Sequence, residues 1–441
     1  MHGLVTLAGE TEDGDGGVHD ATGTNDPDDS FGDGVAKIGD LAAAAGVRSI
    51  HVLAWRDLDD VEAGGSELHI HEMARRWAAA GLDVTLRTSW AQGQPTEDIR
   101  DGYRVVRRAG RHMVFPRAAA AELFRRTGPR DVLVEIWNGM PFLSPMWNRG
   151  PRVIIIHHVH GEMWKMALGP RLGVLGELFE RRVAPAFYRG STIVTVSESS
   201  KRELVDELGL PPDRIRVIPN GVDARYSPGP VTKEAGPLVV AVGRLAPVKR
   251  YDVLVRAADI ARRRLGLPLR LEIVGEGFER PLVESVIDEL DAGGWVSLRG
   301  SIDEADKIDL YRRAWVVASA SAREGWGLSL TEAAACGTPA VASRISGHED
   351  AVIDDVSGVL VPGDPEALGA AMARVLGDDE LRARLRQGAL DRAAQLSWTA
   401  AATAFMRVVA DEVTTRRASQ HHKTGRPSWR TVASAARRPS R

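Results

Sequence analysis

The feature that most constrains this chain is a regular alternation of short apolar segments with amphipathic segments of helical period. The first series of expected strands covers residues 49–55, 83–89, 131–136, 152–158, 191–197 and 214–220. After a Gly/Pro-rich stretch, a second series covers residues 238–244, 269–275, 295–300, 314–321 and 340–343. Strands that alternate with helices form parallel sheets covered on both faces. The sequence therefore predicts an α/β fold with two Rossmann-like doubly wound domains facing a cleft.

The two ends of the chain differ in character from these series. Residues 1–46 form an acidic extension rich in Gly and Asp, and residues 414–441 form a basic tail. Segments with few large apolar residues bury too little surface to offset the entropy lost on ordering. We therefore expect both ends to be disordered and place a first domain at 47–225 and a second at 226–396.

Composition excludes several classes of protein. The chain has 441 residues and a net charge of −3, which predicts no nucleic-acid partner. Its single cysteine, Cys336, cannot form an internal disulfide, and no apolar run is long enough to cross a bilayer. A cytoplasmic protein is the expectation.

Charged residues follow two strands of the second series. Arg244 and Lys249 lie on one loop, a pattern that suits a diphosphate. The stretch EGWGLSLTEAAA begins at Glu324, turns through Gly325 and Gly327, and opens a helix whose N-terminus favours anions. Glu324 and Glu332 then flank the anion and accept hydrogen bonds from hydroxyl groups on either side of it. A nucleotide sugar has this arrangement, with Glu324 on the sugar and Glu332 on the ribose.

Several motifs resemble those of family 4 glycosyltransferases, which have the GT-B fold. The resemblance in the second half rests on GRLAPVKRYDVL, EIVGEGFER, EGWGLSLTEAAACGTPAVAS and HEDAVIDDVSGVLV. In the first half it rests on AGGSELHIHEMARRWAAAGLDVTL, TVSESSKREL and VIPNGVD. The resemblance covers roughly residues 47–413, with Trp326 where Phe is more usual and Arg250 where Gly is common.

The resemblance implies a retaining hexosyltransferase that needs neither metal nor cofactor and acts in cell-envelope or polysaccharide synthesis. It implies that residues 397–413 form a helix crossing back to the first domain. Catalytic residues would be Glu324, His158, Arg244 and Lys249. The implied donor-binding residues are Gly64, Gly65, Arg244, Lys249, Gly275, Gly325, Trp326, Gly327, Leu328 and Glu332.

Three histidines, His157, His158 and His160, end the apolar segment VIIIHHVH. Similar proteins place a histidine here against the donor sugar or acceptor, and strand length favours His158. A metal site is an alternative for His158 and His160, since alternate strand residues share a face. A buried structural histidine is a third interpretation.

Acceptor and location are less constrained. The acceptor is expected to be a glycan, a small molecule or a lipid-linked group. Residues 169–190 mix Leu, Phe and Arg, and the family resemblance implies that such a segment can contact the inner face of the plasma membrane. A core helix with a basic edge is the favoured interpretation. Two alternatives stay open: an epimerase or phosphorylase using the same cleft, and a nonenzymatic binder that uses the basic tail.

Overall fold

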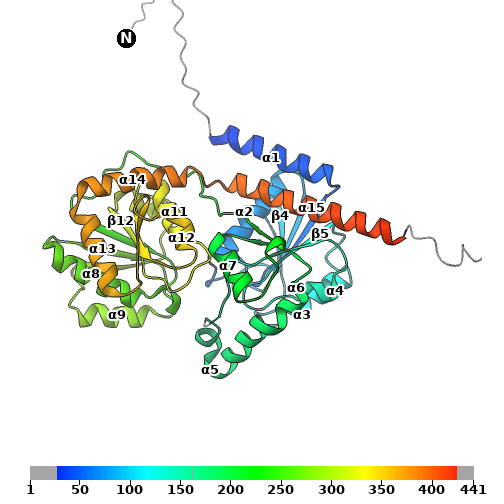
Figure 1. Cartoon of the computed structure of the whole chain (residues 1–441), viewed down its shortest axis with the longest axis horizontal. Coiled ribbons are helices and arrows are strands. Elements are labelled where there is room, and N and C mark those ends of the chain that lie inside the picture. Colours follow the sequence, from blue (N-terminus) through cyan, green and yellow to red (C-terminus); the bar gives the residue numbers. More distant parts are fainter. Residues whose placement is uncertain (1–26, 162, 425–441) are drawn as a thin grey trace, which may run out of the picture.

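The computed structural model describes residues 27–161 and 163–424, which form two α/β domains lying side by side (Figure 1). Each domain is built on one sheet. Most strand residues are buried, as expected for sheets covered by helices on both faces. The predicted fold class is confirmed.

The first sheet has the strand order β3-β4-β2-β1-β5-β6-β7-β8 and is parallel except for the antiparallel edge strand β3. Its strands are β1 (Ser49–Leu53), β2 (Asp83–Thr88), β3 (Glu97–Arg100), β4 (Tyr103–Arg107), β5 (Val132–Ile136), β6 (Arg152–Ile155), β7 (Thr192–Thr195) and β8 (Ile215–Val217). The associated helices are α2 (Gly65–Ala79), α3 (Val114–Leu123), α4 (Ser144–Trp147), α5 (Met163–Leu178), η1 (Phe179–Val183), α6 (Ala184–Tyr188), α7 (Glu198–Asp206) and η2 (Pro212–Arg214).

The second sheet is entirely parallel, with the order β11-β10-β9-β12-β13-β14 of a doubly wound domain. Its strands are β9 (Leu238–Val242), β10 (Arg270–Val274), β11 (Val296–Gly300), β12 (Val316–Ser319), β13 (Ala340–Ser343) and β14 (Gly358–Val361). Its helices are η3 (Pro247–Lys249), α8 (Tyr251–Leu265), α9 (Arg280–Glu289), α10 (Glu304–Arg313), α11 (Leu328–Ala335), α12 (His348–Ala351), α13 (Pro365–Gly377) and α14 (Asp379–Ala393).

Three strands, β3, β4 and β14, were not among those expected from the sequence. The edge strand β3 has the sequence EDIR, and most of its residues are exposed. It therefore lacks the apolar content that predicts a strand. β14 is a four-residue strand that pairs with β13 and forms one edge of the second sheet.

The expectation of disorder is wrong for part of each end. Pro27–Ala44 form helix α1, which buries Ile38 and Ala42 against the final helix, α15 (Trp398–Thr424). The prediction rested on the acidic composition of residues 1–46 and missed the few apolar residues that form one face of α1. Helix α15 lies along the first domain (Figure 1), and it continues through residues 414–424, beyond the helix end expected at 413. Residues 1–26 and 425–441 of the predicted tails lie outside the described residues.

Across residues 27–161 and 163–424, no helix combines the length and the apolar character required to cross a bilayer.

Candidate active site

The site is built from loops that leave the carboxyl ends of parallel strands in both domains. The first domain contributes the loop before α2 and the residues that follow β6. The second domain contributes the loops after β9 and β12. Ligands of open α/β sheets bind at these strand ends. Most of the residues predicted from the sequence lie on these loops, where the strand ends of the two domains face each other.

Lys249 and Glu324 form an ion pair within the second domain. Lys249 Nζ donates to Glu324 Oε1 over 2.5 Å, and Ser321 Oγ donates to the same oxygen over 2.8 Å. Burial raises the pKa of the Glu324 carboxyl, but the charge and hydrogen bond of Lys249 outweigh it, so this pKa lies below its usual value. Glu324 is therefore an ionised carboxylate near neutral pH.

Arg244 lies on the same loop as Lys249 and faces the first domain. Its guanidinium makes no hydrogen bond or ion pair within the described part of the chain. Burial lowers the pKa of Arg244, and the charge of Arg56 lowers it further. Arg244 thus offers guanidinium donors at the boundary between the domains that no described residue engages.

Gly64 and Gly65 bring the first domain onto the loops of the second. A Cβ built at Gly64 would lie 3.7 Å from Arg244 Nη2, and one at Gly65 would lie 3.1 Å from Leu328 Cδ1. The predicted glycine loop therefore passes directly over Arg244 and the start of α11. A bulkier residue at Gly65 would crowd Leu328.

The glycines of the turn before α11 allow close packing as well as a free helix start. A Cβ at Gly325 would lie 2.7 Å from the His157 carbonyl oxygen, and one at Gly327 would lie 3.2 Å from His348 Cδ2. Gly275, after β10, has φ +136°, and a Cβ there would lie 2.0 Å from the Gly243 oxygen. Gly275 therefore brings two loops together.

Trp326 was predicted to bind the donor, but its side chain is 4% exposed and lies in the core of the second domain. Any contact it makes with a ligand in the cleft must come from its backbone. Leu328, by contrast, lies at the start of α11 against Gly65.

Glu332 lies one turn into α11 in a small pocket that both domains line. The pocket of about 180 Å³ includes Leu68 and Trp398 from the first-domain side, and Glu332 and Tyr226 from the other. Tyr311 Oη donates to Glu332 Oε2 over 3.2 Å, and Lys307 Nζ lies 3.6 Å from the same oxygen. Burial raises the pKa of Glu332, and Lys307 offsets this only in part.

The three histidines after β6 have different surroundings. His157 is buried, and its Nε2 lies 2.8 Å from His69 Nδ1. His158 stacks on His160 with ring centroids 4.9 Å apart, and within the described residues neither ring nitrogen of His158 has a hydrogen-bond partner. Burial lowers the pKa of His158 to about 3, so the ring is neutral. His158 is therefore the member of the three with both ring nitrogens available to a ligand.

The described residues supply no third ligand for a metal ion held by His158 and His160. The backbone N–H groups of His160 and Gly161 donate to Glu180, and Trp164 Nε1 donates to the same carboxylate over 2.9 Å. In the part of the chain that the structure describes, no group of three His, Cys, Asp or Glu side chains is arranged to hold a metal ion.

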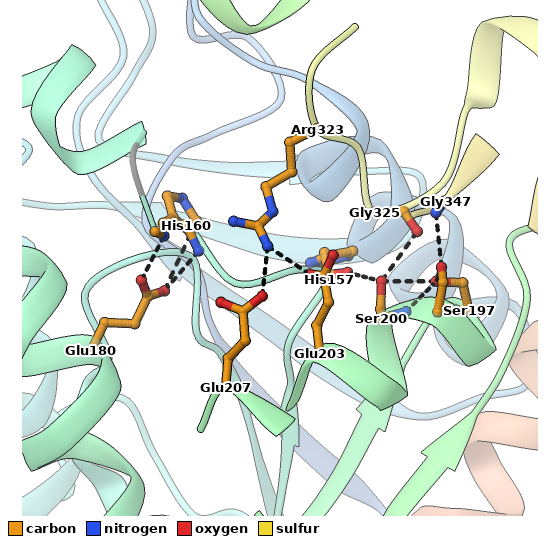
Figure 2. A network of polar contacts seen from close by, with 12 residues as sticks. His157, His160, Glu180, Ser197, Ser200, Glu203, Glu207, Arg323, Gly325 and Gly347 are labelled. Atoms are coloured by element: carbon orange, nitrogen blue, oxygen red, sulfur yellow. Dashed lines mark hydrogen bonds and ion pairs between the residues drawn. The ribbon is translucent and has the colours of Figure 1, made fainter. Parts of the chain in front are cut away.

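A polar network that the sequence did not predict joins α7 to the Glu324 turn (Figure 2). Ser200 Oγ donates to the His157 carbonyl oxygen over 2.8 Å, and Gly347 N donates to Ser199 Oγ over 2.8 Å. Arg323 Nη2 lies 3.0 Å from Glu207 Oε1 and 3.3 Å from Glu203 Oε2. The network fixes the residue next to Glu324 against the first domain.

Asp350 completes this contact from the second domain. Its carboxylate accepts hydrogen bonds from the backbone N–H groups of Glu198 and Ser199, at the N-terminus of α7, over 3.0 and 3.2 Å. The sequence identified these two segments only as parts of separate family motifs, TVSESSKREL and HEDAVIDDVSGVLV, and not as partners. Their pairing depends on how the two domains face each other.

Two family models match adjacent parts of the chain. The model "Glycosyltransferase Family 4" matches residues 63–226, and "Glycosyl transferases group 1" matches residues 225–392. The D-inositol 3-phosphate glycosyltransferase of Xylanimonas cellulosilytica is 31% identical, over 84% of this chain and 96% of that protein. The protein of the same description from Frankia alni is 35% identical, over 78% and 94%.

Solved structures share the fold. The sucrose-phosphate synthase of Thermosynechococcus elongatus superposes with a TM-score of 0.68 at 22% identity, over 81% of this chain and 97% of that one. Anabaena HepE, solved in complex with UDP and glucose, superposes with a TM-score of 0.63 at 17% identity, over 84% and 100%.

Proposed function

Because the chain belongs to the family 4 glycosyltransferases of the GT-B fold, we propose that it takes its sugar from a nucleoside-diphosphate donor and retains the anomeric configuration. The observation that carries the proposal is the meeting of Arg244, the Lys249–Glu324 pair and the Gly64–Gly65 loop at one place. The complex of HepE with UDP and glucose supports a donor of this class.

In the proposed reaction, the bond between the anomeric carbon and the diphosphate oxygen breaks while an acceptor hydroxyl forms a new bond on the same face. The proton of that hydroxyl passes to the departing phosphate oxygen. Negative charge accumulates on the diphosphate as the bond breaks. Arg244, Lys249 and the backbone N–H groups near Gly327 would stabilise that charge, and preorganised donors of this kind supply much of an enzyme's rate enhancement.

The two glutamates have separate roles in this proposal. Glu324 is ionised and would accept hydrogen bonds from hydroxyls of the donor sugar. Glu332 lies in the interdomain pocket and would accept hydrogen bonds from the ribose. His158, neutral and with both ring nitrogens unpaired in the described residues, would contact the transferred sugar.

We propose that the enzyme requires neither a metal ion nor a cofactor, because Arg244 and Lys249 supply the positive charge that the leaving diphosphate needs. Activity that persists in EDTA supports this assignment. Activity that is lost in EDTA and restored by Mg²⁺ contradicts it.

The acceptor is proposed to be a hydroxyl of a phosphorylated polyol, a sugar or a lipid-linked glycan. The names of the relatives, D-inositol 3-phosphate glycosyltransferases, favour the phosphorylated polyol as the first acceptor to test. A role in cell-envelope or polysaccharide synthesis fits any of these acceptors.

We also propose peripheral contact with the inner face of the plasma membrane by a protein that otherwise resides in the cytoplasm. Helix α5, at the lower edge of the view in Figure 1, and the residues after it in the sequence have exposed apolar side chains close in sequence to exposed arginines. The exposed apolar residues are Leu172, Val174, Leu175, Leu178, Val183 and Phe187. A surface that combines apolar and basic groups suits an anionic bilayer.

The test is incubation with UDP-, GDP- and ADP-glucose, with and without D-inositol 3-phosphate, followed by NMR of the products. We expect a glycoside that forms only with acceptor and has the anomeric configuration of the donor. Epimerised or phosphorolysed donor in place of a glycoside would contradict the proposal, and an inverted product would contradict retention.

A further inference from the structure

An arginine-lined groove lies on the first domain, away from the candidate active site. It is formed where α3 covers β2 and the edge strands, and its volume is about 380 Å³. None of its lining residues belongs to the donor site described above. The groove is lined by Arg87, Glu97, Arg104, Val106, Arg108, Arg117, Ala120, Ala121, Arg126 and Thr127.

The charges around the groove are strongly unbalanced. Five arginines line it, and Glu97 is the single acidic residue among the lining side chains. Glu97 already accepts hydrogen bonds from Arg104 over 2.6 Å and from Arg108 over 2.5 Å. These two hydrogen bonds lower the pKa of Glu97, so it is ionised, but one carboxylate cannot neutralise five guanidinium groups.

Within the described residues, three of the five arginines form no ion pair with an acidic side chain. The guanidinium groups of Arg87, Arg117 and Arg126 make no hydrogen bond or ion pair within the described residues. Arg126 lies over the ring of Phe124, with 5.6 Å between its Cζ and the ring centroid. Arg117 and Arg126 are exposed at the edge of the groove, where solvent hydrates them.

Arg87 is different, because it is 7% exposed and its buried Nε has no hydrogen-bond partner among the residues that the structure describes. Burial lowers the pKa of Arg87. The charge of Glu122, which is itself hydrogen-bonded to His51 and Arg130, raises it, and the charge of Arg108 lowers it again, so the pKa of Arg87 stays below its usual value. A buried cation without a paired anion destabilises the fold. An anion in the groove would remove that destabilisation.

We propose that this groove binds a phosphate-bearing small molecule, with Arg87 at its base and Arg108, Arg117 and Arg126 around its mouth. A phosphate group carries up to two negative charges and several acceptor oxygens, which match a ring of planar guanidinium donors. The size of the groove fits a phosphate ester or a diphosphate. The site is independent of the donor site, so it goes beyond the proposed function.

Calorimetric titration of the full chain with inorganic pyrophosphate tests the proposal. All proteins in this titration carry Lys249→Ala, and the protein with this change alone is called the parent. The change weakens binding at the donor site, whose cations also suit a diphosphate. Adding Arg117→Ala, which changes an exposed residue of the groove, should weaken pyrophosphate binding about tenfold. Arg214 is an exposed arginine outside the groove, so adding Arg214→Ala should leave pyrophosphate binding unchanged. Equal binding by all three proteins, or no binding by the parent, overturns the proposal.

Thermal unfolding separates a ligand-binding Arg87 from a structural one. In phosphate-free buffer, Arg87→Met should raise Tm by about 2–4 °C because it removes an unpaired buried charge. Pyrophosphate should raise the Tm of the Lys249→Ala parent and leave that of the same parent carrying Arg87→Met unchanged. An Arg87→Met variant with a lower Tm that still responds to pyrophosphate would show that Arg87 only supports the fold.

A lipid headgroup presents the same phosphate chemistry, so the source of the ligand needs its own control. Vesicles of phosphatidylglycerol and of phosphatidylcholine are compared by co-sedimentation with the parent and its Arg117→Ala variant. We expect Arg117→Ala to leave vesicle binding unchanged. Loss of phosphatidylglycerol binding in this variant, with no pyrophosphate binding by the parent, would overturn the small-molecule proposal in favour of a membrane contact.

Discussion

Glu324 and Glu332 belong to the same turn and helix, yet they lie in opposite electrostatic settings. Glu324 is paired with Lys249 and has a lowered pKa, whereas Glu332 is buried beside Tyr311 and has a raised one. Burial alone would raise the pKa of both carboxyls. Each glutamate has a lysine nearby, but Lys249 is hydrogen-bonded to Glu324 at 2.5 Å, whereas Lys307 lies 3.6 Å from Glu332 and the charge of Glu304 opposes it. The difference shows that a close lysine contact, rather than burial, decides which carboxylate is held ionised.

The largest expected effect comes from removing the charge of Glu324. Glu324→Gln should lower kcat about 10²- to 10³-fold with a small change in donor KM, because its interactions strengthen as the sugar–phosphate bond breaks. Steady-state kinetics with the preferred donor measures this. Glu349→Gln, an exposed glutamate on the nearby helix α12, is the matched control and should retain full activity. A Glu324→Gln enzyme with parental kcat would remove Glu324 from the mechanism.

Removing Lys249 should erase most of the contrast between the two glutamates. Lys249→Ala is expected to lower kcat about 10²-fold, since it removes a cation from the leaving diphosphate and the partner that lowers the pKa of Glu324. Kinetics across the pH range measures both effects, and the acidic limb of the profile should move to higher pH. An unshifted limb would mean that Lys249 does not control the ionisation of Glu324.

Changing Glu332 should affect binding more than turnover. Glu332→Ala is expected to weaken nucleoside-diphosphate affinity about tenfold, or about 1.4 kcal/mol, and to leave kcat within a few-fold of the parent. Calorimetry and kinetics measure the two quantities separately. Glu284→Ala, an exposed glutamate on α9, controls for general effects of the substitution. A kcat loss as large as that of Glu324→Gln would end the distinction between the two residues.

Arg323 tests whether the contact with α7 positions the Glu324 turn. Its ion pairs with Glu203 and Glu207 are partly exposed, so the direct stabilisation is about 1 kcal/mol or less. Arg323→Ala should therefore keep its Tm within about 3 °C and lower kcat by about two- to fivefold. Arg323→Lys should recover part of the loss. A variant with unchanged kcat would show that the turn needs no support from α7.

The smallest expected effect is a difference in pH dependence. A raised pKa keeps Glu332 protonated at pH values above 4.5, where an unperturbed glutamate is ionised. Nucleotide affinity should therefore fall as pH is lowered from neutrality toward this range, because protonated Glu332 has fewer acceptor sites for the ribose. Glu332→Gln should flatten the dependence. An identical slope in both proteins would assign the titration to another group.

Much of the fold and part of the site followed from the sequence. Apolar strands alternating with helices were sufficient for two parallel sheets, and the charge and glycine pattern after strands located Arg244, Lys249 and the Glu324 turn. The edge strand β3 was missed because its charged, exposed residues have no apolar pattern. Helix α1 was missed because its few apolar residues find their partner in α15, which is distant in sequence.

The predicted site differs most where packing decides the direction of a side chain. Trp326 lies between two glycines of the turn, yet its ring is buried in the domain core. Arg323 belongs to the turn and pairs with Glu207 of the first domain, and Ser200 of the first domain donates to the Gly325 carbonyl oxygen of the turn, so both contacts depend on how the domains meet. Sequence spacing predicts neither the direction of the Trp326 ring nor the contacts between the domains, because both arise from tertiary packing.

The most direct test of the account is a crystal structure with whichever of UDP, GDP or ADP binds most tightly in calorimetry. We expect the diphosphate within about 3 Å of donors from Arg244, Lys249 and the backbone near Gly327, and the ribose at Glu332. A diphosphate located only in the arginine-lined groove, or on any surface away from Arg244 and Lys249, would contradict the account.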